Sequence, residues 1–317
     1  EGDEEKTASM IEQAPARRQL PAPGSRRFHP GRIRFPVPVR SAGCSGPSGA
    51  GSGPQPGGSC VTIAASGSEG STDSVVTLDT EDGHEYKRCA DGDILRPLFA
   101  IMNPELMMTL PPYQTASGIS DIMAHCMERY FSHTKECELT DRLLEAVMLT
   151  MIKEARRVMK DPMNYDARAN IMWAAMVAQN NSTGVGRAQD WGTHHMDNEI
   201  GILYGASHGA GLALLFPYWM MYAMKTQGPT LFAKYASRVW GIPMDFEHPE
   251  LTAMEGIKAF QRFVKEDLGM PTTISELGGK EEDIPKMVEN MFYEAPNHGN
   301  FVKLTPEIAA EIYKMAL

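Results

Sequence analysis

The segment DWGTHHMDNEIGILYGASHGAG (residues 190–211) contains three of the chain's nine histidines, His194, His195 and His208. Apolar residues at helical spacing follow the first two, and two glycines separate that stretch from His208. A helix carrying His194, followed by a turn that delivers His208, could bring both imidazoles to one point. His195 would then point about 100° away from His194 on the same helix. The segment therefore predicts a helix, a turn and two imidazoles able to share one ligand.

A second pair of candidate ligands lies upstream, in the stretch SDIMAH (residues 120–125). Asp121 and His125 are four residues apart, which places both side chains on one face of a helix. Taken alone, such a pair is also typical of a surface ion pair. Together with His194 and His208 it supplies one oxygen and three nitrogens, a set that suits Fe²⁺ or Zn²⁺ and can leave a coordination position open for substrate. The spacing thus raises a catalytic metal site as a hypothesis.

Most of the chain around these residues has the apolar periodicity of amphipathic helices. The last of these stretches has Thr305 as its expected N-cap, Pro306 at the first helical position and Glu307 near the positive end of the helix dipole. An all-helical domain is therefore predicted over residues 111–317. The helical stretches are residues 115–132, 140–159, 166–180, 209–225, 231–241, 252–269 and 305–317.

The N-terminal part of the chain has a different pattern. Residues 1–58 are dominated by Pro, Gly, Ser and Arg, which predicts a disordered segment, because such a composition buries little apolar surface. Residues 59–110 contain the short strand-like runs VTIAAS (61–66), SVVTLDT (74–80) and LFAIM (98–102). A small α/β region is therefore expected over residues 59–110, ahead of the helical domain.

Composition excludes several classes of protein. The net charge of −10 argues against nucleic acid as a partner, because binding the phosphate backbone requires a basic surface. No apolar run approaches the roughly 20 residues of a membrane span, and no signal peptide is apparent at the start. The five cysteines are odd in number and form no CxxC pair, which favours reduced thiols and a cytoplasmic protein.

The motifs taken together resemble the iron-containing (group III) alcohol dehydrogenases, and within them the butanol dehydrogenase branch. The similarity is carried by D-x3-H followed by H-x13-H, and by long segments in the same order: residues 103–131, 184–217, 268–291 and 299–317. It extends from about Val61 to Leu317. The resemblance implies the dehydroquinate synthase-like fold of that family, with an α/β dinucleotide-binding domain and a helical metal-binding domain.

The resemblance also implies roles for individual residues. It places the metal ligands at Asp121, His125, His194 and His208, with Fe²⁺ or Zn²⁺ as the ion, bound to the substrate oxygen as a Lewis acid. TIAASGSE (residues 62–69) is similar to the family segment that wraps the cofactor. The implied contacts to NAD(H) or NADP(H) are Thr62, Ser66, Gly67 and Lys87.

Two departures from the family pattern bear on activity. Many relatives have a histidine four positions after the third ligand, implicated in proton relay, and this chain has Asn198 there. Asparagine can hydrogen-bond the substrate or the cofactor but does not titrate near neutral pH, and His195 is the alternative proton carrier. The family also places over a hundred residues ahead of the cofactor segment, including a GGGS loop that PGGSC (residues 56–60) only echoes. A truncated dinucleotide-binding domain is therefore expected.

The leading functional hypothesis is a metal-dependent, NAD(P)H-linked alcohol dehydrogenase or aldehyde reductase acting on butanol-type primary alcohols, expected as a homodimer. The alternative is a truncated, non-catalytic homologue that retains only the metal-binding domain. A lyase of the dehydroquinate synthase type shares the architecture and is disfavoured by the unbroken match to butanol dehydrogenase segments.

Overall fold

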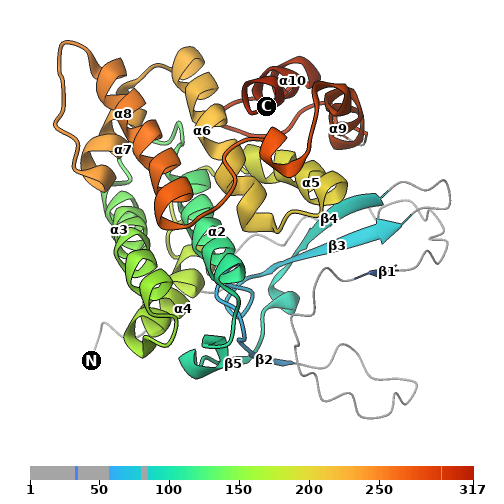
Figure 1. The fold of residues 1–317 in the computed structure, drawn as a ribbon, viewed down its shortest axis with the longest axis vertical. Helices are drawn as coiled ribbons and strands as arrows, with labels where there is room; N and C mark the ends of the chain where they lie inside the picture. The colour runs from blue at the N-terminus through green and yellow to red at the C-terminus, as the bar shows by residue number, and fades with distance from the viewer. Residues whose placement is uncertain (1–32, 35–56, 80–84, 294) are drawn as a thin grey trace, which may run out of the picture. The chain divides into compact units, whose positions relative to one another are not determined.

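The structure, a computed structural model, describes residues 33–34, 57–79, 85–293 and 295–317. Within these residues, the strands form two small sheets that precede the helices in the chain (Figure 1). One has the order β1-β3-β4 and is antiparallel throughout, and the other pairs β2 with β5 in parallel. The strands are β1 (Ile33–Arg34), β2 (Gly58–Cys60), β3 (Asp73–Asp79), β4 (Glu85–Asp91) and β5 (Phe99–Ile101).

Helices make up the part of the chain that follows β5 (Figure 1). Its last helix is capped as predicted, because the Thr305 hydroxyl accepts the N–H of Ile308 and Pro306 occupies the first position. The helices are α2 (Pro112–Tyr130), α3 (Glu138–Lys160), α4 (Tyr165–Gln179), α5 (Gly192–Tyr204), α6 (His208–Gln227), α7 (Thr230–Trp240), α8 (Pro249–Arg262), α9 (Ile284–Met291) and α10 (Pro306–Met315).

Helix α2 lies at the centre of the helical part. Every residue from Thr115 to Tyr130 is buried, and α3, α4 and α6 pack around the helix. The approach of α6 is close at Gly209, where an added Cβ would lie 1.9 Å from the carbonyl oxygen of Ser117. A residue larger than glycine would therefore hold the two helices apart. This contact brings the start of α6, and with it His208, next to the middle of α2.

The predicted helices are confirmed at all seven stretches, and the predicted strands only in part. SVVTLDT and LFAIM correspond to β3 and β5, whereas residues 61–66 do not form a strand. The pairing of β2 with β5 ends at Val61, whose N–H donates to the carbonyl of Ile101. The chain then turns. Strand β4 was not predicted, because EYKRCAD has little apolar alternation and is held by its pairing with β3.

Most of the predicted disordered segment, residues 1–58, lies outside the described residues, and within it Ile33–Arg34 pair with β3. In the described residues, no helix has the length and apolar character needed to cross a membrane.

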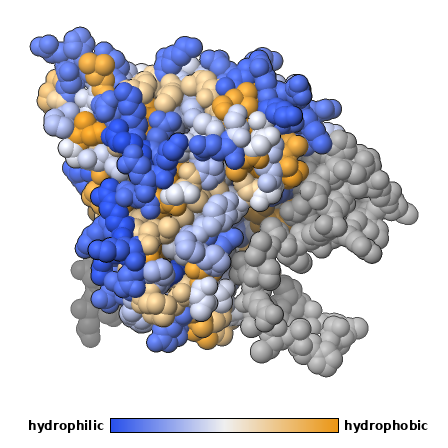
Figure 2. All heavy atoms as spheres, in the orientation of Figure 1, coloured by the Kyte–Doolittle hydropathy of each residue, from blue (hydrophilic) through white to orange (hydrophobic). Residues whose placement is uncertain are grey.

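Figure 2 shows hydrophilic side chains gathered over α3 on the viewed face. Charged residues of α3 form ion pairs along or across that helix, such as Arg142 with Glu138 and Arg156 with Asp267.

Candidate metal centre

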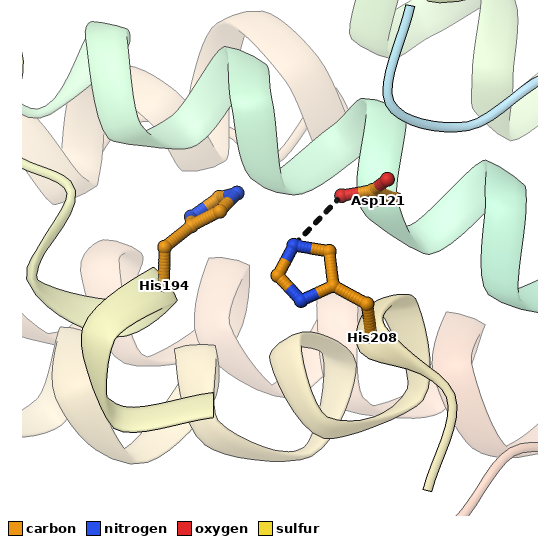
Figure 3. A group of neighbouring side chains, drawn as sticks. All are labelled: Asp121, His194 and His208. Atoms are coloured by element: carbon orange, nitrogen blue, oxygen red, sulfur yellow. Dashed lines mark ion pairs between the residues drawn. The ribbon is translucent and has the colours of Figure 1, made fainter. Parts of the chain in front are cut away.

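Three helices each contribute one side chain to a shared point between them (Figure 3). Asp121 comes from the buried middle of α2, His194 from the first turn of α5, and His208 is the first residue of α6. One ligand atom of each residue lies within 4.8 Å of those of the other two. The predicted helix and turn thus deliver His194 and His208 to the same place, and Asp121 faces them.

The fourth predicted ligand, His125, lies beside this group without joining it. Its Nε2 is 3.5 Å from Oδ1 of Asp121, one turn earlier on α2, and its ring is stacked on that of His194 with centroids 5.1 Å apart. Its Nδ1 is buried without a hydrogen-bond partner. His125 is therefore adjacent to the centre, while Asp121, His194 and His208 are the three that converge.

The ligand atoms of the group are largely free of other partners. Oδ1 of Asp121 and Nε2 of His194 are both buried and make no hydrogen bond. Buried polar atoms are almost always satisfied, so two such atoms facing one point fit a site for a cation. The His208 side chain is 38% exposed against 3% for Asp121, so the group opens toward solvent on the His208 side.

Electrostatics around the three residues favour a cation. Burial raises the pKa of Asp121, although His208 and His194 oppose the rise. Burial and the charge of His208 lower the pKa of His194 to about 3, which keeps this imidazole neutral and able to bind a metal. Burial alone would lower the pKa of His208, but Asp197 and Asp121 raise it to about 9. A cation beside Nε2 of His208 would replace the proton that Asp121 stabilises there, while Nδ1 stays hydrogen-bonded to Asp197.

Two buried carboxylates support the histidines, and neither was identified from the sequence. Oε1 of Glu128 lies 2.7 Å from Nδ1 of His194, and Oδ2 of Asp197 is hydrogen-bonded to Nδ1 of His208. Glu128 follows His125 by three residues on α2, and Asp197 follows His194 by three on α5. This three-residue spacing is the sequence signal that could have pointed to the two carboxylates, but it does not show which helix faces meet.

Trp191 forms a wall of the centre. It precedes α5 in the left-handed conformation, with φ of 65°, which is uncommon for a residue with a side chain. The Trp191 ring lies 4.8 Å from the ring of His194, edge to face. In its other contact, the guanidinium of Arg129 from α2 lies 4.7 Å from the centroid of the Trp191 ring. The indole thus contacts both His194 and the guanidinium of Arg129.

The two residues proposed for proton transfer lie on α5 in different surroundings. Asn198 follows His194 by one helical turn and is partly buried. His195 packs instead against His298, with ring centroids 4.2 Å apart, and is exposed. As the helical geometry predicted, His195 does not belong to the group that converges at the centre.

Of the predicted cofactor contacts, Lys87 lies near the centre. It extends from β4 so that its Nζ lies against Gly201 of α5, and its charge acts on His208. Thr62, Ser66 and Gly67 lie in the turn that follows β2, where Oγ of Ser66 is hydrogen-bonded to Oγ of Ser68. Ser66 is exposed, Thr62 is partly buried and Gly67 is buried.

Comparison with known proteins agrees with this architecture. The family model "Fe-containing alcohol dehydrogenase family, C-terminal" matches residues 115–317. NADH-dependent butanol dehydrogenase B of Clostridium acetobutylicum is 34% identical over 260 residues, which are 82% of this chain and 66% of that protein. NADPH-dependent aldehyde reductase YqhD of Escherichia coli is 32% identical, with the same coverage of both chains.

The solved structures show the same relation in space. The crystal structure of Escherichia coli YqhD superposes with a TM-score of 0.77 at 31% identity, covering 83% of this chain and 66% of that one. NADH-dependent butanol dehydrogenase A from Thermotoga maritima gives 0.76 at 31% identity, covering 82% and 66%. The chain thus spans just under two thirds of the length of these relatives and has their fold over that part. From the matched family model and these structures, we conclude that the chain belongs to the iron-containing alcohol dehydrogenase family.

Proposed function

We propose that this chain is a metal-dependent, NAD(P)H-linked alcohol dehydrogenase or aldehyde reductase that interconverts aldehydes and primary alcohols. The observation that carries the proposal is the convergence of Asp121, His194 and His208 at one point, in a chain of the iron-containing family. Relatives whose names record NADH-dependent butanol dehydrogenase and NADPH-dependent aldehyde reductase activity support the reaction class.

The residues that would hold Fe²⁺ or Zn²⁺ are Asp121, His194 and His208, with His125 as the fourth ligand expected from the sequence. The donor set combines one carboxylate oxygen with imidazole nitrogens, which suits either ion. When bound, the metal supplies Lewis-acid polarisation of the substrate oxygen, and the nicotinamide supplies or accepts hydride. The buried, unpartnered atoms of Asp121 and His194 support this assignment.

The chain's own groups define where the reaction would take place. The exposed side at His208 would give the substrate access, and the Trp191 ring packs edge to face against His194. Thr62, Ser66, Gly67 and Lys87 are proposed to contact NAD(H) or NADP(H), and the charge of Lys87 acts on His208. Asn198 is proposed to hydrogen-bond the substrate or the nicotinamide, and His195 stays the alternative proton carrier. A homodimer and a cytoplasmic location remain predictions.

Metal analysis of the purified chain tests the proposal. We expect about one Fe²⁺ or Zn²⁺ per chain and loss of that metal in His208→Ala, because the variant removes one of three converging ligands. His298→Ala is the matched control, since His298 packs against His195 and lies outside the group. Metal content that is unchanged in His208→Ala would reject the site.

The second candidate is a non-catalytic homologue that binds metal without reducing aldehydes. The chain spans about 66% of the length of the relatives, and nucleotide binding is the property that separates the two candidates. Titration with NADH and NADPH, followed by butanal reduction, distinguishes the two. Affinity for either nucleotide together with turnover supports the enzyme, whereas metal binding without nucleotide binding supports the homologue.

A further inference from the structure

We propose that Glu128 and Asp197 are positioning residues for the metal centre, each fixing one histidine in the tautomer that exposes Nε2 to the ion. The inference rests on the proposed function, because it assigns His194 and His208 as metal ligands. The proposal adds two carboxylates that are not themselves ligands, each of which contacts Nδ1 of one histidine.

Glu128 holds His194 through both of its oxygens. Oε1 lies 2.7 Å from Nδ1 of His194 and accepts the backbone N–H of the same residue at 3.1 Å. Oε2 accepts the backbone N–H of Trp191 at 2.7 Å. Because both oxygens accept hydrogen bonds from backbone donors, the carboxylate acts as an acceptor toward the ring as well. Nδ1 of His194 therefore carries the proton, and the lone pair is left on the buried, unpartnered Nε2.

The same carboxylate fixes the helix that bears the ligand. Trp191 offers no side-chain cap for α5, and the first N–H groups of a helix need acceptors. Glu128, which is 0% exposed, supplies them from α2. One side chain thus sets the position of α5 relative to α2 and the orientation of the His194 ring.

Asp197 plays the corresponding part for His208. Its Oδ2 is hydrogen-bonded to Nδ1 of His208, while Nε2 of that ring lies 3.6 Å from Oδ1 of Asp121. Asp197 is 0% exposed. A Cβ added at Gly211 would lie only 1.9 Å from its Oδ1. Gly211 of α6 therefore leaves the space that this carboxylate occupies between α5 and α6.

The two contacts share one chemical consequence. A carboxylate on Nδ1 fixes the ring orientation and makes Nε2 a more basic ligand, and loss of such a partner typically weakens metal binding by about 10- to 100-fold. The two carboxylates also add negative charge beside an ion of charge +2, without occupying a coordination position. Open coordination for the substrate is thereby kept.

The test measures metal affinity rather than turnover. Zn²⁺ binding to the full chain is determined by competition with a chromophoric chelator, and Co²⁺ absorption reports the ligand geometry. We expect Asp197→Leu and Glu128→Ala to weaken Zn²⁺ binding by about 10- to 100-fold. Asp197→Asn should bind Zn²⁺ more tightly than Asp197→Leu, because its amide oxygen can still accept a hydrogen bond from Nδ1–H of His208. Glu154→Gln is the matched control, since Glu154 is equally buried on α3 and pairs with Arg157 away from the centre.

The outcomes separate this inference from the proposed function. A wild-type chain that binds no Zn²⁺ contradicts the proposed metal site itself. If folded Asp197→Leu and Glu128→Ala bind Zn²⁺ with the affinity of the wild type and give the same Co²⁺ spectrum, only the role of the carboxylates is overturned. Histidine ¹⁵N spectra of the zinc-loaded wild type need no variant: protons on Nδ1 of His194 and His208 support the inference, and a proton on either Nε2 overturns it.

Discussion

The close approach of α6 to α2 at Gly209 makes a sharp prediction about the variant Gly209→Ala. The added methyl group would lie 1.9 Å from the backbone oxygen of Ser117, well inside van der Waals contact. Because the obstructing atom is backbone, no side-chain rotation relieves the overlap. Helix α6 must move away from α2 by more than an ångström, and His208, the adjacent residue, moves with it.

Two opposing effects decide the size of the change. Alanine in place of glycine inside a helix gains about 1 kcal/mol from backbone entropy. Overpacking of a rigid contact costs about 1–3 kcal/mol and occasionally more, and here the upper end applies because the overlap is with main chain. We expect a net loss of about 1–2 kcal/mol in the free energy of unfolding. Metal sites tolerate ligand displacements of only about 0.2 Å, so Zn²⁺ affinity should fall by at least about tenfold.

Both quantities are directly measurable in the purified chain. Urea unfolding gives the stability, and chelator competition gives the Zn²⁺ affinity of the folded protein. Thr226→Ala is the control, because it lies in the same helix at an exposed position and leaves both α2 and the ligand set untouched. If Gly209→Ala were as stable as the wild type and bound Zn²⁺ within twofold of it, the close helix contact would not be what positions His208.

Three further predictions concern other parts of the molecule. Asp190→Ala should lower the free energy of unfolding by about 2–3 kcal/mol, because the carboxylate accepts the buried N–H of Phe301 at 2.6 Å; a midpoint unchanged in urea would contradict this. Phe131→Ala, at a fully buried ring in the aromatic core, should cost about 3–5 kcal/mol in the same assay, and a loss below about 1 kcal/mol would show that the core collapses around the gap. Cys89 is exposed and should react with iodoacetamide at pH 8, whereas Cys126 is buried with a pKa raised to about 12 by burial and should react only on unfolding, as peptide mass spectrometry can show.

The local parts of the fold were predictable from the sequence because they depend on neighbouring residues. Helical periodicity identified α2 to α4 and α6 to α8, and the Thr305–Pro306 pair identified the start of α10. The strands were less predictable, since a strand is stabilised by its partner. Residues 61–66 have strand-like composition and turn away after Val61, while the polar β4 is held by β3.

The sequence identified the side chains that the structure brings together at the candidate centre, and it did not reveal the residues that support them. The spacing selected Asp121, His125, His194 and His208, and the structure brings Asp121, His194 and His208 of this set together. It did not place His125 to the side of the group, and it did not find Glu128 and Asp197. Acidic residues three positions after a histidine are common on solvated helix faces, so the pattern carries no information until the facing helix is known.

The sequence by itself determined where most of the helices lie, and which residue types could bind a cation. Only the tertiary structure decided that α2, α5 and α6 meet at one point, since that depends on which helix faces pack and how closely. Glycine at position 209 allows the approach, and burial of the carboxylates makes their contacts with the histidines specific. The physical reason is that helix formation depends on contacts within a few residues, whereas a metal centre requires side chains far apart in the chain to converge within a few ångströms.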